Sequence, residues 1–516
     1  MTDMKAMPYW KEALSVPRYT SLDRDLSVDV VVVGAGITGL TAAYLLKRAG
    51  RTVGVVDRFG VGGVDTMCTT AHLTCVTDLG LNELVSNFGR DHAQATWDAG
   101  LAAIDQIDTI VSDEQIACDW TWCPGFKHAA RGAELGEERG RLQPEAVLAE
   151  EMGFDALYVN ELPFVGRPGI AFDGQAKFHP GKYATALASI IDGSGSFIFE
   201  KTTCDEVMDK PLGIKAGKFT IRCGYLVLAT HTPLMGKSNV ASATLLQTKL
   251  YLYTTYVVGG RLPKGTVPEA LFWDTADPYH YLRVDRHPDY DYAIFGGGDH
   301  KTGQLADTLS RYQELEAAAR AELPGFEPTH RWSGQVVETN DGLPFIGETS
   351  PRQFAATGYS GNGMTFGTLA GMMARDAALG RKNPWQELFD VGRTKIKGGA
   401  WDYVKENVDY PYYMIRDRLA GAEGRSLRAV KRGEGKILDL NGERVAAFRD
   451  DKGKLTLLSP ICTHMGCQVA WNGAERTWDC PCHGSRFQAN GDVLSGPAES
   501  PLPPASLKGR ETTAAR

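Results

Sequence analysis

The sequence predicts an α/β protein followed by a small all-β domain, and two observations carry this prediction. A βαβ unit opens the chain, with a β-branched strand over Asp29–Gly34, a helical stretch to Ala49 and a second strand ending at Asp57. Such a unit places two parallel strands side by side, as in a doubly wound sheet. From about Leu427 onward, short strands separated by Asn-Gly and Lys-Gly turns replace this pattern, as expected of an all-β domain.

Composition places the chain among ordinary globular proteins and narrows its partners. The 516 residues allow about two to four domains. With 43% hydrophobic residues, 23% charged residues and a net charge of −8, neither nucleic acid nor an anionic membrane surface is expected as a partner. The N-terminus lacks a positively charged start followed by an apolar stretch, and no run approaches about 18 apolar residues. We therefore expect a cytoplasmic protein without a membrane span.

The segments between these two regions alternate helical and strand patterns. Residues 82–150 are largely helical in composition, with charged and glycine-rich interruptions near 132–140. Periodicity predicts strands at 219–223, 225–229, 250–259, 292–296, 436–440, 445–449 and 454–458, and helices at 310–323 and 363–379. The mixed, charged residues 395–425 are predicted to form a connector, and the tail at 509–516 is expected to fray.

A glycine-rich turn lies between the first strand and the first helix. Gly34, Gly36 and Gly39 form a Gly-x-Gly-x-x-Gly motif, and Asp57 follows 23 residues after Gly34. The glycines permit the turn, the approach of a pyrophosphate and close helix–strand packing, while the helix N-terminus favours phosphate charge. Because motif and context occur together, we predict a dinucleotide site and not merely a tight βα turn. The expected contacts here are Gly34, Ala35, Gly36, Thr38, Gly39, Asp57 and Arg58.

Four of the ten cysteines fall within residues 462–482, in two boxes that each pair a Cys with a His. Two such loops supply two thiolates and two imidazoles, the ligand set of a Rieske [2Fe–2S] centre, whose potential lies at roughly −150 to +300 mV. A Cys2His2 zinc site uses the same ligand types, but a zinc finger expects paired Cys and paired His. The spacing therefore favours a Rieske cluster held by Cys462, His464, Cys480 and His483.

The two boxes resemble those of the cytochrome bc complex type of Rieske domain. In that type a second Cys in each box forms a disulfide over the cluster, and the resemblance gives this role to Cys467 and Cys482. It also implies that Ser485 hydrogen-bonds a cluster sulfur and that Gly496-Pro497-Ala498 forms the covering proline loop. High-potential members have Tyr where this chain has Phe487, and one hydrogen bond fewer predicts an intermediate potential.

Several segments of the larger region resemble the D-amino-acid oxidase superfamily of FAD enzymes. Residues 225–231 resemble the second flavoprotein strand, which ends in Ala-Thr near the cofactor, and residues 332–347 and 358–371 resemble the C-terminal FAD segments. The whole chain resembles Rieske-fused FAD-dependent oxidoreductases of that superfamily. The resemblance implies FAD instead of NAD, and a Rossmann-like FAD-binding domain with an inserted antiparallel-sheet substrate domain. It adds as FAD contacts Thr70, His72, Val207, Ala229, Thr230, Gly361, Asn362, Gly363 and Met364.

The same resemblance divides the chain into domains. The oxidoreductase is expected over 1–395, with FAD-binding segments at about 28–80, 170–240 and 332–390 and substrate-domain segments at about 81–169 and 241–331. A connector at 396–425, the Rieske domain at 426–508 and a tail at 509–516 follow.

Three further residues carry open alternatives. His72 ends a Thr-Thr-Ala-His run that falls where some dimethylglycine-type relatives bond a His covalently to the flavin; the alternative is an ordinary polar contact near FAD. Arg283 precedes a strand where D-amino-acid oxidases place an Arg that grips the substrate carboxylate, and a surface ion pair is equally expected. Tyr253 is either a packing residue or a substrate contact. No catalytic residue is assigned.

These features predict an oxidoreductase with two redox centres. A small amine or amino acid would be oxidised at its C–N bond, with a hydride passing to flavin and electrons leaving singly through the cluster to an external acceptor. Alternatively, an external donor reduces the cluster, which feeds the flavin for reduction or oxygen activation, or the cluster domain is a redox sensor or docking module. A second dinucleotide fingerprint and a close His/His/carboxylate set are both missing from the sequence, which disfavours an NAD(P)H reductase and a Rieske oxygenase.

Overall fold

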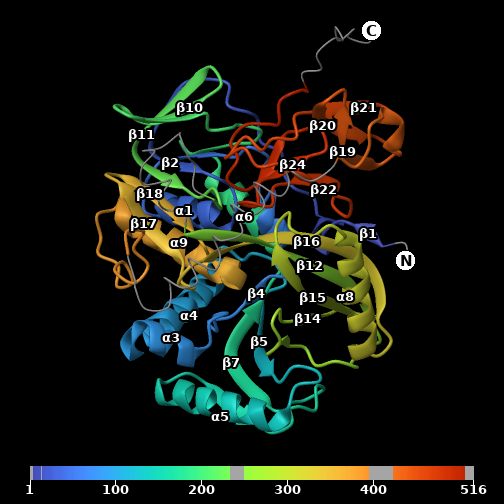
Figure 1. The fold of residues 1–516 in the computed structure, drawn as a ribbon. Coiled ribbons are helices and arrows are strands. Elements are labelled where there is room, and N and C mark those ends of the chain that lie inside the picture. Colours follow the sequence, from blue (N-terminus) through green and yellow to red (C-terminus); the bar gives the residue numbers. More distant parts are fainter. Residues whose placement is uncertain (1–3, 13, 233–248, 394–421, 506–516) are drawn as a thin grey trace. The chain divides into compact units, whose positions relative to one another are not determined.

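A computed structural model describes residues 4–12, 14–232, 249–393 and 422–505 (Figure 1). The chain divides into two units. One comprises residues 1–250, 255–299 and 312–400, and the other comprises 251–254, 300–311 and 401–516. The predicted connector lies outside the described residues as far as residue 421, and the predicted tail at 509–516 lies outside them entirely.

The βαβ unit of the sequence forms the centre of an eight-stranded sheet. Strand β2 (Leu26–Val33) pairs in parallel with β3 (Val53–Val56) on one side and with β11 (Phe219–Leu228) on the other. The strand order is β17-β18-β11-β2-β3-β8, with β10 and β9 extending from β11. The other strands are β8 (Phe197–Phe199), β9 (Glu206–Asp209), β10 (Leu212–Ala216), β17 (Phe345–Ser350) and β18 (Gln353–Thr357). The C-terminal half of β2, Val30–Val33, is buried, which explains its unbroken valine run.

Two helices pack together beside this sheet, and glycines bring them close. Helix α1 (Ile37–Arg48) contacts α9 (Gly363–Ala378). A Cβ at Gly367 would lie 2.7 Å from Ile37, and one at Gly371 would lie 2.7 Å from Thr41. Gly367 and Gly371 therefore lie on the face of α9 that packs against α1.

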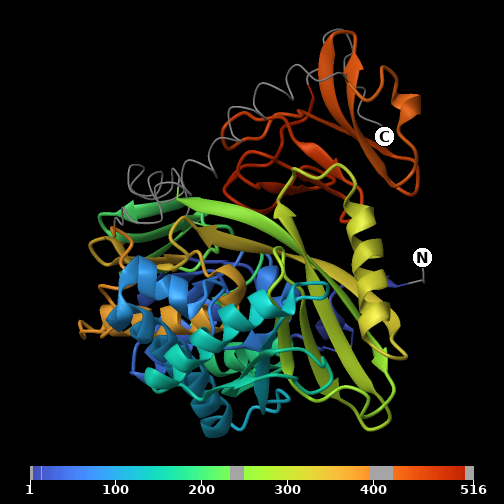
Figure 2. The same cartoon turned by 60° about the horizontal axis from the view of Figure 1, so that its bottom comes forward.

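A second sheet has ten strands. Its strand order is β1-β16-β12-β15-β14-β13-β5-β7-β4, with β6 paired to β7. The strands are β1 (Lys5–Ala6), β4 (His72–Leu73), β5 (Thr121–His128), β6 (Ala156–Val159), β7 (Gly169–Lys177), β12 (Leu250–Leu262), β13 (Leu271–Asp274), β14 (Tyr281–Arg286), β15 (Asp291–Lys301) and β16 (Glu327–Thr339). Most of the residues of this sheet belong to the first unit, and short parts of β12 and β15 are assigned to the second. Helix α8 (Thr308–Glu322), yellow in Figure 2, lies along this sheet and stacks Tyr312 edge-on against Tyr256, with ring centroids 4.9 Å apart.

Eight further helices complete the described part of the chain. They are η1 (Tyr9–Lys11), α2 (Asp65–Cys68), α3 (Leu81–Phe88), α4 (Arg90–Asp113), α5 (Leu135–Glu151), α6 (Pro180–Ile191), η2 (Ser360–Asn362) and η3 (Leu427–Ala429). Of these, α3, α4 and α5 lie mostly in the region predicted as largely helical. The predicted helical region also contains strand β5. None of the described helices combines the length and the apolar composition that a membrane crossing needs.

The C-terminal region is all-β, as predicted. Strands β19 (Glu434–Leu440), β20 (Glu443–Arg449) and β21 (Leu455–Leu458) form one antiparallel sheet. Strands β22 (Ala470–Asn472), β23 (Thr477–Asp479), β24 (Arg486–Gln488) and β25 (Val493–Ser495) form another. The turn between β19 and β20 places Asn441 at φ 59° and Gly442 at φ 83°, the positive angles of a two-residue hairpin. Trp478 and Phe487 are fully buried in the core.

Candidate redox sites

The three glycines of the dinucleotide motif do three different things. Gly34 has φ 109°, and a Cβ there would overlap the carbonyl oxygen of Ala229. A Cβ at Gly39 would overlap the carbonyl of Gly34, so this glycine allows the helix to pack on the turn. A Cβ at Gly36 would meet only Thr66 Oγ1, at 3.1 Å. This contact is tight, and Thr66 Oγ1 also accepts from the Ile37 amide at 3.0 Å, so the Thr66 hydroxyl lies at the start of α1, where the motif predicts a pyrophosphate.

Asp57 braces this turn from the end of β3. Its Oδ2 accepts from the amide of Ala35 at 2.8 Å, and its Oδ1 accepts from the amides of Phe59 and Gly60 at 2.7 and 2.8 Å. An ionised carboxylate has about four lone-pair sites, so one remains for a ribose hydroxyl. Burial raises the pKa of Asp57.

The other predicted contacts of this region lie around the same turn. Thr38 Oγ1 lies 3.0 Å from the hydroxyl of Tyr359, and the Arg58 guanidinium lies 4.9 Å from the Phe59 ring. The Ala229 amide donates to the carbonyl of Val33 at 2.8 Å. The hydroxyl of Thr230, which follows Ala229, donates to Thr232 O at 2.7 Å.

A second helix N-terminus opens at the predicted Gly361–Met364 turn. The Gly361 amide donates to Asp78 Oδ2 at 2.7 Å, and Asn362 Nδ2 donates to the carbonyl of Val76 at 2.9 Å. A Cβ at Gly363, the first residue of α9, would meet no atom within 4 Å, and Met364 behind it is buried. An open helix N-terminus favours a negatively charged group. These residues and the glycine turn of α1 fit the two ends of a dinucleotide cofactor.

His72 is held by contacts at both ring nitrogens. Nδ1 lies 3.0 Å from Thr70 Oγ1, and Nε2 lies 3.3 Å from the carbonyl of Leu282. Burial lowers the pKa of His72 to about 3, so the imidazole is neutral, with Nε2 as donor. These contacts favour the ordinary polar role, and the covalent bond to flavin stays an untested prediction.

Arg283 is buried inside the protein and is not exposed at the surface. Its Nη1 donates to the carbonyls of Thr70 and Ala71 at 3.0 and 2.9 Å, and its Nε donates to Asp285 at 2.8 Å. The side chain is 2% exposed and lies over the Trp10 ring. Its donors therefore hold the His72 segment in place, which favours the ion-pair interpretation over substrate binding, although this pair is buried and was expected at the surface. Tyr253 is half-buried on β12, and its substrate role stays a prediction.

Val207 packs against the apolar cluster that contains Val33 and Val56, the last residues of β2 and β3. It is on β9, opposite Ile214 of β10, in the apolar layer beneath that meander. The nearby segment that approaches the turn is Thr202, whose amide donates to the Asp57 carbonyl at 2.8 Å. The contact between Val207 and FAD stays a prediction.

Two residues near the α9 turn were not singled out from the sequence. Asp78 follows β4, and Asp299 lies near the end of β15, 221 positions later in the chain. Tyr279 Oη donates to Asp78 Oδ1 at 3.1 Å, and Asp299 interacts electrostatically with Asp78. Asp299 directly follows the run Gly296–Gly298, and an acid after glycines at a strand end was the available signal.

The two Cys/His boxes fold into loops of the same form. In the first, the Cys462 amide donates to Cys467 O at 2.8 Å and the Gly466 amide donates to Cys462 O at 3.0 Å. In the second, the Cys480 amide donates to Ser485 O at 2.8 Å and the Gly484 amide donates to Cys480 O at 3.0 Å. Gly466 and Gly484 have φ 78° and 68°, so each loop turns at a glycine in the left-handed region.

The four predicted ligands come from these loops. The His464 and His483 rings lie 4.9 Å apart and nearly perpendicular. Burial lowers the pKa of each to about 4, so both imidazoles are neutral, as metal ligation requires. The Cys462 and Cys480 thiols hydrogen-bond one another, which lowers the pKa of Cys462 to about 7. The donor set therefore fits a [2Fe–2S] cluster with two sulfur and two nitrogen ligands.

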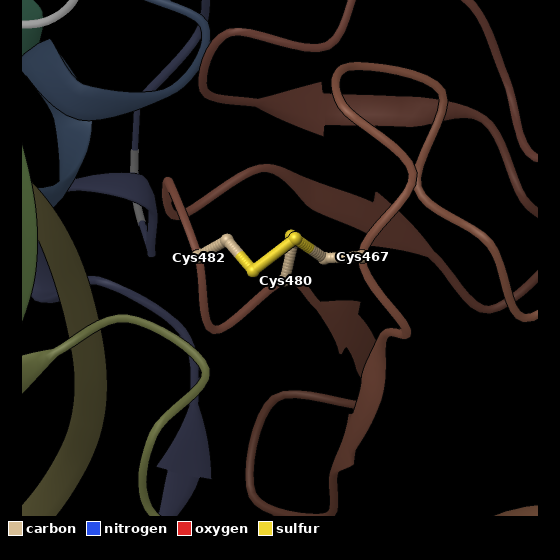
Figure 3. Close-up of side chains that lie close together, drawn as sticks. All are labelled: Cys467, Cys480 and Cys482. Atoms are coloured by element: carbon tan, nitrogen blue, oxygen red, sulfur yellow. A yellow bond between two sulfur atoms is a disulfide. The ribbon is translucent and has the colours of Figure 1, made fainter. Parts of the chain in front are cut away.

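The implied disulfide is present between Cys467 and Cys482, with Cα atoms 6.5 Å apart (Figure 3). Their sulfurs and that of Cys480 lie within 4.8 Å of one another. Disulfide sulfurs are not thiolates, so this trio is not itself a metal site. It shows that the disulfide lies against a cluster ligand.

The surroundings of the boxes also match the resemblance. The Ser485 hydroxyl hydrogen-bonds the Cys462 sulfur and accepts from the Ala498 amide at 3.1 Å. A Cβ at Gly496 would lie 2.7 Å from Ser485 Cα, so the proline loop packs directly on the second box.

Comparison with known proteins supports both sites. The family model "FAD dependent oxidoreductase" matches residues 29–377. The chain belongs to this family. The "Rieske [2Fe-2S] domain" model matches residues 425–506. The cofactors of this FAD dependent oxidoreductase are therefore FAD and a Rieske [2Fe–2S] cluster.

Three similar proteins illustrate the relationship. YhfW of Bacillus subtilis (strain 168), a protein named for a Rieske 2Fe-2S centre, is 31% identical over 499 residues, with 96% of each chain covered. Gamma-glutamylputrescine oxidoreductase of Escherichia coli (strain K12) is 21% identical and covers 81% of this chain and 100% of its own. The crystal structure of glycine oxidase from Geobacillus kaustophilus superposes with a TM-score of 0.60 at 16% identity, covering 72% of this chain and 99% of its own. This last likeness confirms the fold of the oxidoreductase region.

Proposed function

We propose that this oxidoreductase oxidises the C–N bond of a small amine or amino acid and passes the electrons singly through its Rieske cluster to an external acceptor. The observation that carries the proposal is the presence, in one polypeptide, of an FAD site and a complete cluster ligand set with its disulfide. Relatives named for gamma-glutamylputrescine and for glycine support amine or amino-acid chemistry.

The flavin side of this proposal assigns roles to the chain's own residues. Bound FAD would act as the hydride acceptor for the carbon atom beside the amine nitrogen. The turn at Gly36 and the start of α1 would hold the pyrophosphate, and Asp57 would hold the ribose. The N-terminus of α9 at Gly363 would favour negative charge at the ring end. The imine that the substrate becomes can be hydrolysed by water.

The surface of the cluster loops supports an external redox partner. His464 and His483 are half-buried, so each imidazole reaches the surface of the second unit. Beside His464, the apolar side chains of Ile461 and Met465 are 39% and 48% exposed. An apolar rim around a redox ligand suits brief docking of a partner protein, because exposed apolar patches mark interaction sites.

The direct test is anaerobic mixing of the FAD-loaded, cluster-loaded protein with a panel of amines and amino acids. We expect one of these compounds to bleach flavin absorbance and then to produce the EPR signal of a reduced Rieske cluster. A Cys462→Ser variant, which loses a cluster ligand, should bleach equally without the EPR signal. Bleaching without cluster reduction in the intact protein would contradict electron exit. Reduction by a ferredoxin but by none of these compounds would favour the opposite direction of flow.

A further inference from the structure

Four side chains from distant segments meet beside the Gly361 turn, and we call Asp78, Tyr279, Tyr281 and Asp299 the acid–tyrosine cluster. Tyr279 Oη donates to Asp78 Oδ1 at 3.1 Å, and the two tyrosine rings lie 5.8 Å apart. Asp299 interacts electrostatically with Asp78 and with both tyrosines. The cluster therefore gathers two carboxylates and two aromatic rings in one place.

The cluster touches the turn that begins helix α9. The Gly361 amide donates to Asp78 Oδ2 at 2.7 Å. A Cβ at Gly361 would lie 2.8 Å from both Asp78 Oδ1 and the Tyr279 hydroxyl, so no larger residue fits there without displacing the cluster. Since the residues of this turn are predicted FAD contacts, the prediction also places the cluster where a substrate of the flavin would meet the protein.

A glycine run on β15 makes room for the aromatic rings. A Cβ at Gly296 would overlap the Tyr281 ring, and one at Gly297, which has φ 144°, would lie 2.7 Å from the Tyr279 carbonyl. The three consecutive glycines, which do not continue as a nucleotide-binding turn, are thus explained by the close packing of these tyrosines. Thr255 fixes one ring through a 2.8 Å hydrogen bond to the Tyr281 hydroxyl.

Among the described residues, His280 interacts favourably with Asp299, but its main partner is Asp274, which lies outside the cluster. Oδ1 of Asp299 is buried and has no hydrogen-bond partner among the described residues. The nearby His280 lies 3.4 Å from Asp274. The closest buried cations on this sheet, Arg283 and Lys177, are both held by Asp285 at 2.8 Å. The cluster therefore holds two carboxylates, and one of them has a buried oxygen without a hydrogen-bond partner among the described residues. Such a site favours the binding of a positively charged ligand.

We propose that the acid–tyrosine cluster binds an ammonium group of the substrate, which makes the substrate class a cationic amine and not a compound anchored by its carboxylate. The inference rests on the proposed amine oxidation and deepens it: the bound ammonium would give a proton to one of the two carboxylates before the hydride leaves, because only a neutral amine can become an imine. Asp78 and Asp299 supply opposite charge, and the faces of Tyr279 and Tyr281 attract a cation through their ring quadrupoles. A carboxylate on the substrate would be repelled here, and the guanidinium of Arg283 is occupied elsewhere.

The test uses a cation that cannot be oxidised. Tetramethylammonium has no lone pair on nitrogen and cannot become an imine, so its binding can be followed by the perturbation of flavin absorbance in the FAD-loaded full chain. We expect it to bind at least about tenfold more tightly than neopentyl alcohol, an uncharged compound of similar size, and more tightly than acetate. Asp299→Asn should weaken tetramethylammonium binding about tenfold or more. Glu206→Gln, which removes an exposed carboxylate paired with Lys215, is the matched control and should change nothing.

A second pair of variants keeps the proposal decidable if Asp299→Asn fails to bind FAD. Tyr281→Phe retains the ring and should retain tetramethylammonium binding, whereas Tyr281→Leu should lose most of it. Equal binding of tetramethylammonium and neopentyl alcohol, or preferred binding of acetate, would overturn the inference. Either result could occur while amino acids still bleach the flavin, so the cluster proposal can fail alone. Cation binding without bleaching by any amine would instead overturn the proposed function.

Discussion

At the scale of single residues, the hydroxyl of Ser485 hydrogen-bonds the sulfur of Cys462, a predicted cluster ligand. A hydrogen bond to a cluster sulfur stabilises the reduced, more negative state. A net hydrogen bond of about 0.5–1.5 kcal/mol corresponds to roughly 20–65 mV for one electron. Ser485→Ala should therefore lower the reduction potential by about this amount, measured by EPR-monitored redox titration. Phe487→Tyr, which offers a new hydroxyl, should raise it, and Phe487→Leu should not; equal potentials in Ser485→Ala and wild type would contradict this account.

Asp285 is the residue on which two buried cations depend. Burial acts to raise the pKa of Asp285, but the charges of Arg283 and Lys177 outweigh it and lower the pKa to about 2. Asp285→Asn leaves Arg283 without its partner carboxylate and leaves Lys177 with Glu269 alone, so it should lower the free energy of unfolding by about 3–5 kcal/mol at neutral pH, measured by urea denaturation.

The sign of the pH dependence follows from the lowered pKa. Because the folded-state pKa lies below the ordinary 3.8, the contribution of Asp285 is complete above that value and is lost as the pH falls toward 2, by roughly 2 kcal/mol. The gap between wild type and Asp285→Asn should narrow only in that acid range. Glu206→Gln is the surface control, with a change within about 0.5 kcal/mol at all pH values. A gap that also narrows near neutral pH would contradict this assignment.

At the scale of elements, the contact between α1 and α9 depends on the absence of side chains. A Cβ at Gly371 would lie 2.7 Å from Thr41 and 2.9 Å from the Ala42 amide, so Gly371→Ala should push the helices apart and destabilise the protein by about 1–3 kcal/mol. Because both helix N-termini are predicted to contact FAD, FAD affinity should also fall. Gly140→Ala, on α5 with no atom within 4 Å of its Cβ, should instead stabilise by about 0.5–1 kcal/mol. Thermal unfolding with and without added FAD compares the two, and equal effects would refute the packing argument.

The elements that the sequence predicts well are those whose signal is local. The βαβ unit, the α9 helix and the three strands from Glu434 to Leu458 combine strong periodicity with turn residues of defined conformation, and the structure confirms them. Strand β5 lies in a region that was predicted to be largely helical, because Pro124 and Gly125 weaken its strand pattern. Pairing with β7 and β13 stabilises the strand in the folded protein. Two predicted strands at 219–229 are one strand, β11, because Gly224 continues along β2 instead of breaking the ladder.

The candidate sites divide in the same way. The predicted cluster ligands lie in two short boxes only 13 positions apart (Cys467 to Cys480). Their spacing in the sequence is therefore enough to predict that they form one site. The acid–tyrosine cluster joins residue 78 to residues 279–299 through the ten-stranded sheet, and no local pattern encodes that pairing. The burial of Arg283 is likewise a product of tertiary packing, since its partners Thr70 and Ala71 lie more than two hundred residues earlier.

At the scale of the whole molecule, the two redox centres predict an odd electron capacity. Flavin accepts two electrons and a Rieske cluster accepts one, whereas each amine molecule delivers two. If the centres are connected, an anaerobic titration should reach full reduction of both at about 1.5 equivalents of substrate per chain, and a cluster-free Cys462→Ser variant should reach its end point at about 1.0. Flavin absorbance and the EPR signal of the cluster are the two readouts. The rate of cluster reduction, measured at several protein concentrations, distinguishes the two possible routes of electron transfer. The rate constant is independent of protein concentration for transfer within one chain and depends on it for transfer between chains. An end point at about 1.0 equivalent in the intact protein, with the cluster still oxidised, would mean that the flavin works without the cluster.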